Sequence, residues 1–229
     1  MQTVLVTGSS GNLGHAVVKK FIDGGWTVAG SLLLQEQTPS TLNHANFKPF
    51  NADLSDEAAA SSMVASVIEA CGSIDAAVLT VGGFAMGSIA ETDMTAMLGQ
   101  YKLNFQTTYQ VARPVFVQMM KQGHGRLFMT GARTGINMNS SKGMTAYGLS
   151  KSLIFRLAEL MNAEAKGHDV VTSVIAPSII DTPPNRRSMP DADFDNWVRP
   201  EDIANTVWFY CSKDAAAIRE PVLKIYNNS

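Results

Sequence analysis

Thr7-Gly8-Ser9-Ser10-Gly11-Asn12-Leu13-Gly14 is the stretch of sequence that decides the fold. It follows a short apolar run, Thr3–Thr7, that predicts a buried strand, and it opens a segment with helical spacing of apolar residues, Leu13–Asp23. Glycines at such a junction let the backbone approach an anion, and the helix N-terminus offers it free N–H groups. The stretch therefore predicts a dinucleotide site at Gly8, Ser10, Gly11, Asn12, Leu13 and Gly14; a merely tight strand–helix turn is the alternative.

Strands and helices alternate along the rest of the chain. The predicted strands are Thr27–Ser31, Phe47–Phe50, Asp75–Thr80, Arg126–Thr130, Val170–Ile175 and Val222–Tyr226. The predicted helices are Asp56–Ala70 with Ser55 as N-cap, Asp93–Lys121, Met144–Lys166 and Glu201–Ser212. This alternation predicts one α/β domain over residues 1–229, a Rossmann-type, doubly wound parallel sheet of about seven strands with helices on both faces.

Two proline-containing segments depart from this regular pattern. Pro114 should bend or split the helix Asp93–Lys121, because proline removes a backbone donor. The proline-rich stretch Pro177–Pro200 reads as irregular, and it is too long for a passive connection in a compact domain. We expect it to form a lid or a binding loop.

Composition excludes several classes of function. The formal net charge of −2 and the 17% of charged residues leave no basic patch for nucleic acid or a membrane surface. No apolar run is long enough to span a bilayer. Cys71 and Cys211 form no disulfide framework or metal-type spacing, and the four histidines are scattered, so we expect a cytoplasmic protein without a metal.

Tyr147 and Lys151 are the candidate catalytic pair. They are four residues apart at the start of a predicted helix, so they share one helix face. An ammonium beside a phenol favours the phenolate and lowers the phenol's pKa, which suits a proton donor and acceptor near neutral pH. An exposed helical pair is the alternative, but a preceding glycine loop and five strands make the pattern much more specific.

The whole chain resembles the short-chain dehydrogenase/reductase family. The resemblance rests on Thr7–Gly14, Asn104, Tyr147–Lys151 and Pro177–Thr182. It implies NADH or NADPH as cofactor, Tyr147 as general acid/base and Lys151 on the nicotinamide ribose. It also implies that Asn104 orders a relay water; a buried polar residue holding a helix irregularity is the other reading. Pro177, Ile179 and Thr182 would cover the nicotinamide and meet the carboxamide and pyrophosphate.

Three positions depart from the family pattern. Thr80-Val81-Gly82-Gly83 replaces the family's Asn-Asn-Ala-Gly, which leaves Val81 and Gly82 beside the cofactor. The family's catalytic serine aligns with Ala132, and Thr134 remains as a fallback at the usual spacing from Tyr147. No acidic or basic residue stands at Leu32, where a ribose-binding acid usually ends the second strand, so the choice of nucleotide stays open. Asp53 could bind the adenine amino group or cap a helix.

A closer resemblance is to the dihydropteridine reductase branch of that family. The run Asp181-Thr-Pro-Pro-Asn-Arg-Arg-Ser-Met-Pro-Asp-Ala-Asp-Phe-Asp-Asn-Trp197 carries it, together with Val81–Phe84 and Gly143–Tyr147. It implies hydride transfer to a quinonoid dihydropterin, and alanine in place of serine is part of that branch's pattern. Phe84 could stack on the flat ring or pack as a core or loop aromatic, and Met189 flanks the same site.

The sequence also leaves two alternative functions open and predicts an oligomer. A carbonyl or enone reductase would use Thr134 in place of the serine, and a non-catalytic dinucleotide-binding sensor or scaffold would need only the fold. The family resemblance implies a homodimer, or a tetramer, through the long helices Asp93–Lys121 and Met144–Lys166. The expected ligand besides the cofactor is a small molecule.

Overall fold

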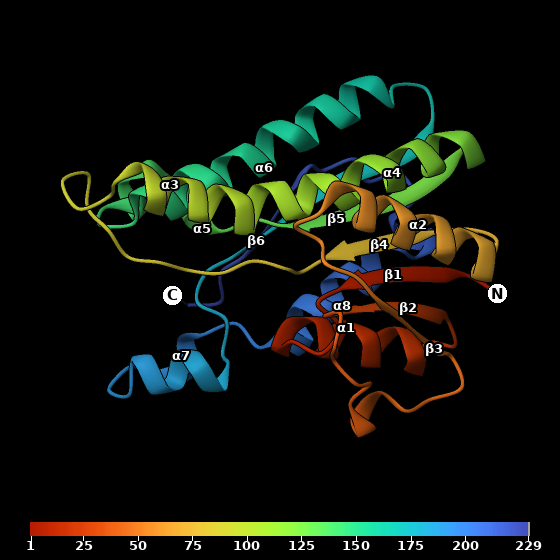
Figure 1. Cartoon of the computed structure of the whole chain (residues 1–229), viewed down its shortest axis with the longest axis horizontal. Helices are drawn as coiled ribbons and strands as arrows, with labels where there is room; N and C mark the ends of the chain where they lie inside the picture. Colours follow the sequence, from red (N-terminus) through yellow and green to blue (C-terminus); the bar gives the residue numbers. More distant parts are fainter. Residues whose placement is uncertain (229) are drawn as a thin grey trace.

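The computed structural model describes residues 1–228, apart from the side chain of Met138. Its strands, ordered in Figure 1 from red to blue, are β1 (Thr3–Thr7), β2 (Thr27–Leu32), β3 (Phe47–Asn51), β4 (Ala76–Leu79), β5 (His124–Thr130), β6 (Asp169–Pro177) and β7 (Val222–Ile225). The α-helices are α1 (Asn12–Asp23), α2 (Glu57–Cys71), α3 (Met94–Gln100), α4 (Thr107–Gln122), α5 (Arg133–Ile136), α6 (Thr145–Glu164), α7 (Pro183–Ser188) and α8 (Pro200–Tyr210). Short 3₁₀ turns lie at Ser40–Leu42, Met138–Ser141, Phe194–Asn196 and Lys213–Ala215. No helix in the described part of the chain is long and apolar enough to cross a membrane.

The strands form one parallel sheet in the order β3-β2-β1-β4-β5-β6-β7, which confirms the predicted fold class. Chain connectivity reverses direction between β1 and β4, because β1 leads outward to β2 while β4 continues the sheet on the other side. Crevices outside the carboxyl ends of strands at such a reversal are where open α/β sheets bind ligands. The glycine loop directly follows β1 and so lies at this point.

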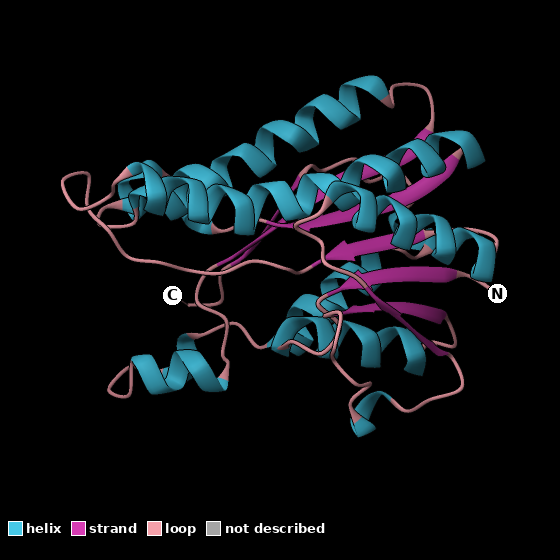
Figure 2. Ribbon diagram, viewed as in Figure 1, coloured by secondary structure: helices cyan, strands magenta, loops and turns pink. Residues whose placement is uncertain are grey.

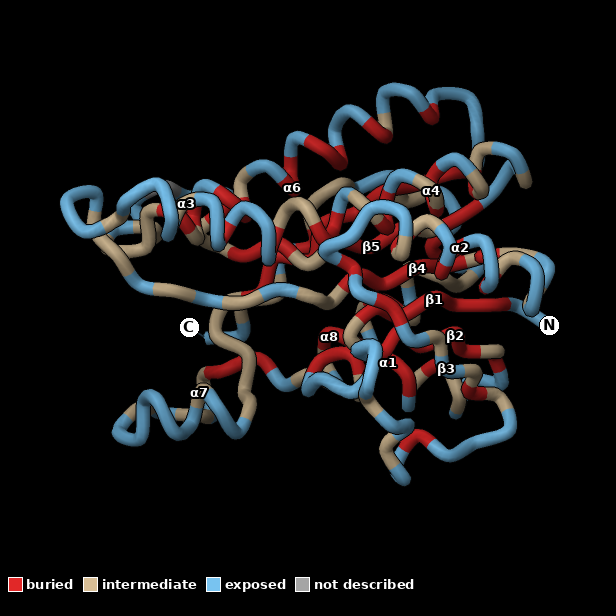
Figure 3. Tube along the Cα trace, in the orientation of Figure 1, coloured by how far each residue is buried: buried red, intermediate tan, exposed pale blue. Residues whose placement is uncertain are grey.

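Helices cover both faces of the sheet (Figures 1 and 2). Val4 and Val6 of β1 pack in one core with α1 and α8, while Leu5 between them packs in the other core with α2, α4 and α6. Successive side chains of a strand point to opposite faces, so a strand buried on both sides needs a continuous apolar run. Figure 3 shows the central strands of the sheet buried, whereas the edge strand β3 is partly exposed, as are the outer side of α6 and much of α7.

The structure corrects the start of the second helix. Ser55 does not cap it: α2 begins at Glu57, and the carboxylate of Asp56 accepts a hydrogen bond from the Ala59 N–H at 2.7 Å. Aspartate and serine are both favoured N-caps, and sequence pattern alone leaves helix ends uncertain by a residue or two.

The long middle helix is interrupted, but not at Pro114, which lies inside α4. The break is a π-helical stretch, Tyr101–Gln106, between α3 and α4. The hydroxyls of Thr107 and Thr108 each donate at 2.7 Å to a carbonyl four residues earlier, which satisfies acceptors at the widened turn. Such bulges occur often at functional sites, and this one holds Asn104.

The segment Pro177–Pro200 is more regular than its prolines suggest. Thr182 caps α7 by accepting from the Asn185 N–H, and an isolated bridge pairs Ile180 with Val198. The Arg186 guanidinium and the Asp181 carboxylate form a bidentate ion pair, with N–O distances of 2.6 and 2.7 Å. Proline is compatible with the first turn of a helix, which is where Pro183 stands.

Candidate active site

The glycine loop is packed against the start of α1. Gly8 has φ +62°, a conformation that L side chains rarely adopt. A Cβ on Gly14 would lie 2.1 Å from the Gly8 carbonyl oxygen, so the helix approaches the loop only because Gly14 has no side chain. Ser10, Gly11 and Asn12 are exposed, while the Leu13 side chain is buried in the core. Free N–H groups of α1 therefore face outward from a fixed cradle, which fits a pyrophosphate.

Hydrogen bonds join this cradle to its neighbours. The Gly8 N–H donates to Ser31 Oγ at 3.1 Å, and the Thr80 hydroxyl donates to the Thr7 carbonyl at 2.6 Å. A pocket of about 610 Å³ opens beside it, between the loop and the segment that contains α7. Its lining includes Ser10, Gly11, Asn12, His15, Asp181 and Arg186. The carboxyl ends of β1, β2 and β4 thus form one surface.

Tyr147 and Lys151 lie on the first turns of α6, where the sequence pattern places them. Lys151 is only 4% exposed, and its Nζ donates to the Thr130 carbonyl at the end of β5, at 2.8 Å. The same Nζ is 6.0 Å from the centre of the Tyr147 ring, which is half-buried. The structure therefore brings the two side chains together at the carboxyl edge of the sheet.

Burial changes the acidity of both groups. It raises the pKa of the Tyr147 phenol to about 12 and lowers the pKa of Lys151 to about 8. The expected lowering of the phenol's pKa by the lysine is therefore wrong for the free protein. Loss of hydration disfavours the phenolate more than the Lys151 ammonium favours it, and burial also disfavours the charged form of Lys151. The phenol is fully protonated at neutral pH, which suits a proton donor.

Asn104 is completely buried in a polar cluster that joins three elements. Its Oδ1 accepts from the Gly83 N–H at 2.9 Å, and its Nδ2 lies 3.0 Å from the Gly83 carbonyl oxygen. Nδ2 also lies 3.0 Å from Gln100 Oε1 and 3.1 Å from Ser150 Oγ. The Ser150 hydroxyl donates to the Tyr147 carbonyl at 2.8 Å. Asn104 thus holds the π-helical turn, the loop after β4 and the start of α6 in one arrangement.

Sequence reasoning missed Gln100 and Ser150. Gln100 precedes Asn104 by one helical turn, and a polar pair at that spacing was the available signal. Gly82 completes the cluster: a Cβ there would lie 2.8 Å from Asn104 Oδ1 and 3.1 Å from Lys151 Nζ. Backbone at this position passes directly between the two polar side chains, which explains a glycine after β4.

At the position of the family's serine, the Ala132 side chain and the Thr134 hydroxyl oxygen are buried. Ala132 is 7% exposed and precedes α5, two residues after the carbonyl that holds Lys151. The Thr134 hydroxyl has no hydrogen-bond partner within the described part of the chain, and its carbonyl accepts from Ser141 Oγ at 2.6 Å.

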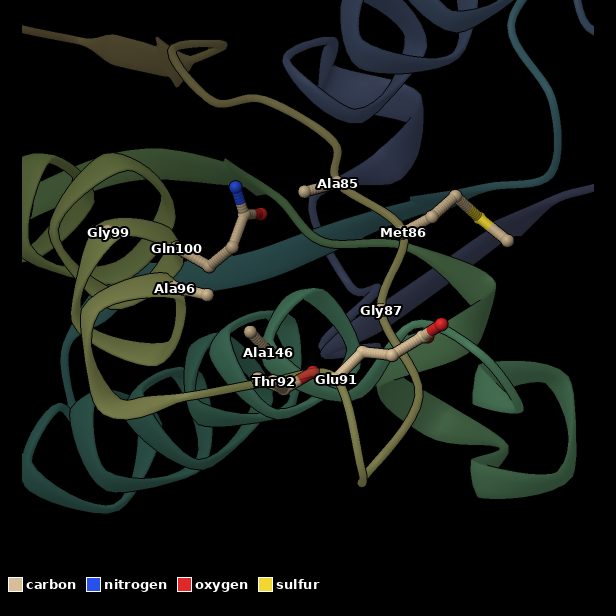
Figure 4. A pocket seen from close by; sticks show the side chains of 9 residues that line it. All are labelled: Ala85, Met86, Gly87, Glu91, Thr92, Ala96, Gly99, Gln100 and Ala146. Atoms are coloured by element: carbon tan, nitrogen blue, oxygen red, sulfur yellow. The ribbon is translucent and has the colours of Figure 1, made fainter.

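Phe84 lies against the candidate catalytic tyrosine. The two ring centres are 5.0 Å apart at an interplanar angle of 78°, an edge-to-face contact, and Phe84 is 60% exposed. It is therefore no core aromatic. Beyond it, a pocket of about 570 Å³ lies between the loop after β4, α3 and the start of α6 (Figure 4). Met86, Glu91, Gln100 and Ala146 are among its lining residues, so it adjoins the Asn104 cluster.

Four residues that we expected to contact the cofactor are buried or bonded to other parts of the chain: Leu32, Asp53, Thr182 and Ile179. The Leu32 side chain is 3% exposed, so the last residue of β2 faces the core and cannot reach a ribose; Leu33 is the exposed neighbour. Asp53 caps no helix, because its Oδ1 accepts from Ser55, and those bonds lower the pKa of its carboxyl. The Thr182 hydroxyl caps α7, and the Ile179 carbonyl accepts from the Val198 N–H at 2.9 Å.

Three further residues that we expected beside the cofactor or the substrate lie at or just after the ends of regular elements. Val81 packs partly buried against the core, with its Cγ2 3.2 Å from the position of a Gly8 Cβ. Pro177 ends β6 and is buried. Met189 follows α7 and is 36% exposed.

The fold and the site together define a Rossmann-type dinucleotide-binding protein with a tyrosine–lysine pair beside the nucleotide cradle. The model of the short chain dehydrogenase family matches residues 2–193. The chain therefore belongs to the short-chain dehydrogenase/reductase family, whose members are NAD(P)-dependent oxidoreductases.

Several known proteins are similar over nearly the whole chain. A dihydropteridine reductase of Dictyostelium discoideum is 27% identical over 210 residues, 90% of this chain and 86% of that protein. A 3-oxoacyl-acyl-carrier-protein reductase of Vibrio harveyi is 24% identical over 231 residues, 96% and 94% of the two chains. A short-chain dehydrogenase/reductase structure from Mycobacterium ulcerans shares the fold with a TM-score of 0.90 at 22% identity, over 99% of this chain and 89% of that one.

Proposed function

We propose that the protein reduces a flat, conjugated small molecule, a quinonoid dihydropterin or a close analogue, with Tyr147 as proton donor. The observation that carries a reductase function is the Tyr147–Lys151 pair on the first turns of α6, joined to the Asn104 cluster. The choice of substrate is supported by the similarity to the dihydropteridine reductase of Dictyostelium discoideum and by Ala132, a residue without a hydroxyl.

Either NADH or NADPH, when bound, supplies the hydride. The cradle formed by Gly8, Ser10, Gly11, Asn12 and Gly14 would hold its pyrophosphate, and the N–H groups of α1 fit that anion. Lys151 would bind the nicotinamide ribose. Asp53, Val81, Gly82, Pro177, Ile179 and Thr182 remain proposed contacts around it, and Thr182 keeps a hydroxyl hydrogen to donate.

The chain's own residues would move the proton. Burial keeps the Tyr147 phenol protonated, so it can donate to the reduced substrate. The phenolate that remains is stabilised by the Lys151 ammonium, because opposite charges at short range attract strongly where water is excluded. We keep the proposal that Asn104 orders a relay water for reprotonation; its contacts with Gly83 fix the orientation of its buried amide. Positioning of donor and acceptor provides the rest of the rate enhancement.

A flat substrate fits the surroundings of Tyr147. Phe84 presents an exposed aromatic ring edge-to-face with the tyrosine, and aromatic rings favour stacked or edge-on packing with a conjugated ligand. Met189 would close over the substrate from the segment after α7. A quinonoid ring accepts hydride more readily than a ketone, so it needs less polarisation by a hydroxyl at position 132.

The rival carbonyl reductase is favoured by one observation, the buried Thr134 hydroxyl without a partner in the described structure. The deciding experiment is oxidation of NADH and of NADPH by the purified protein, with quinonoid dihydropterin beside a panel of ketones and enones. Turnover of the pterin alone supports the proposal. Turnover of ketones that Thr134→Val abolishes would replace it with the rival, and absence of any turnover with retained nucleotide binding would favour a sensor or scaffold.

We also propose a homodimer through α3–α4 and α6. The outer faces of these helices expose large apolar side chains: Leu98, Tyr101, Leu103, Tyr109, Val117, Leu149, Leu153 and Leu160. Scattered apolar residues are normal on a surface, but Leu149, Leu153 and Leu160 recur at helical spacing along α6, and such an apolar stripe favours an interface. The two faces would pair with their own copies about a twofold axis.

A further inference from the structure

A carboxylate lies at the end of β2, although the sequence pattern places none there. Leu33–Glu36 is a turn in which the Glu36 N–H donates to the Leu33 carbonyl at 3.0 Å. The side chain of Glu36 folds back, and its Oε2 accepts from the Leu33 N–H at 3.1 Å. The carboxylate of Glu36 therefore lies beside Leu33, the first residue after β2.

The turn is fixed by the neighbouring strand. Asn51, the last residue of β3, donates through Nδ2 to the Leu33 carbonyl at 2.6 Å and to the Glu36 carbonyl at 2.9 Å. Asn51 itself pairs in register with Leu32. A side chain that bonds to both ends of one turn restrains its conformation, which favours the observed position of the carboxylate before any ligand binds.

The same strand end is tied to the nucleotide cradle. Ser31 Oγ accepts from the Gly8 N–H, and the Ser31 carbonyl accepts from Ser9 Oγ at 2.9 Å. Only Leu32 therefore separates Ser31, which anchors the cradle, from Leu33, whose N–H binds the carboxylate. In dinucleotide folds an acid about 20 residues beyond the glycine loop binds the adenosine ribose. Glu36 follows Gly14 by 22 residues.

Glu36 is the only acidic residue of Ser31–Asn46, and the segment contains no lysine or arginine that could neutralise a phosphate. A carboxylate accepts hydrogen bonds from two ribose hydroxyls, whereas a 2′-phosphate beside it suffers like-charge repulsion. We propose that Glu36 selects NADH over NADPH by binding the adenosine ribose hydroxyls. This inference rests on the proposed function and chooses NADH from its two possible cofactors.

The test is calorimetric titration of the purified protein with NADH and with NADPH. Wild type should bind NADH at least about tenfold more tightly, and Glu36→Gln should narrow that ratio by about tenfold, mainly through tighter NADPH binding. The matched control is Glu69→Gln, the same change of charge on the exposed surface of α2, which should leave the ratio unaltered. Added salt should reduce the discrimination in wild type and less so in Glu36→Gln.

Two results would overturn the inference alone: NADPH binding wild type as tightly as NADH, or an unchanged ratio in Glu36→Gln. Failure of both nucleotides to bind the folded wild-type protein is a different result. It would overturn the proposed function, and the role of Glu36 with it.

Discussion

The Nζ of Lys151 donates a hydrogen bond to the Thr130 carbonyl at 2.8 Å and lies 6.0 Å from the ring centre of Tyr147. The end of β5 therefore holds the ammonium beside the phenol. This one contact links the sheet to the first turns of α6, and four predictions on catalysis, acidity, packing and assembly follow from its surroundings.

Tyr147→Phe should lower turnover by roughly 10²–10⁴-fold, because it removes the proton donor while keeping the ring that contacts Phe84. Nucleotide affinity should be unchanged. Steady-state kinetics and calorimetric titration measure the two separately. Tyr109→Phe, on the exposed face of α4, is the control and should keep full turnover. A Tyr147→Phe enzyme with wild-type turnover would remove this residue from the mechanism.

Lys151 should make stability depend on pH. Its pKa is about 8 in the folded protein against 10.5 for the free side chain. Between these pH values the unfolded chain binds more protons at this group than the folded one, so the folded state gains stability as pH rises. Wild type should gain up to about 3 kcal/mol relative to Lys151→Met across that window, measured by urea unfolding. Parallel curves for the two proteins would show that Lys151 does not titrate there.

Gly82→Ala should lower kcat by about a hundredfold without unfolding the protein. The added methyl group would displace Asn104 Oδ1 or Lys151 Nζ, and small misplacements of catalytic groups are costly. Ser62→Thr is the control, because it adds one methyl group on the exposed surface of α2, away from the site. Circular dichroism checks the fold. Equal kcat for the two variants would mean that the cluster does not align the site.

Leu153→Glu should convert the protein to a monomer. Leu153 is 38% exposed on α6, within the apolar face proposed as the interface, and a charge there would be buried unpaired in the dimer. Sedimentation velocity at micromolar concentration gives the mass. The control is Phe209→Glu, at an exposed position of α8 on the other face of the sheet; this variant should still have the mass of a dimer. A monomeric wild type would contradict the assembly itself.

The fold was largely predictable because local rules act on short stretches. The glycine loop, the alternation of strands and helices, and the apolar run of β1 each follow from neighbours in sequence, and the parallel seven-stranded sheet confirms them. The errors lie where two local rules compete. Ser55 and Asp56 are both favoured caps. Pro114 was a stronger local signal than the π-helical turn, which holds a buried asparagine bonded to a distant loop.

The sequence by itself predicted the glycine loop between β1 and α1 and the tyrosine–lysine pair, because a strand–helix junction and a spacing of four on a helix are local features. Tertiary structure alone decided the acidity of that pair, the partners of Asn104 and the place of the Glu36 carboxylate. Burial depends on what packs around a side chain. A turn can place a carboxylate next to a strand end at which the sequence itself has no acidic residue. Both are set by contacts between segments that are far apart in the sequence.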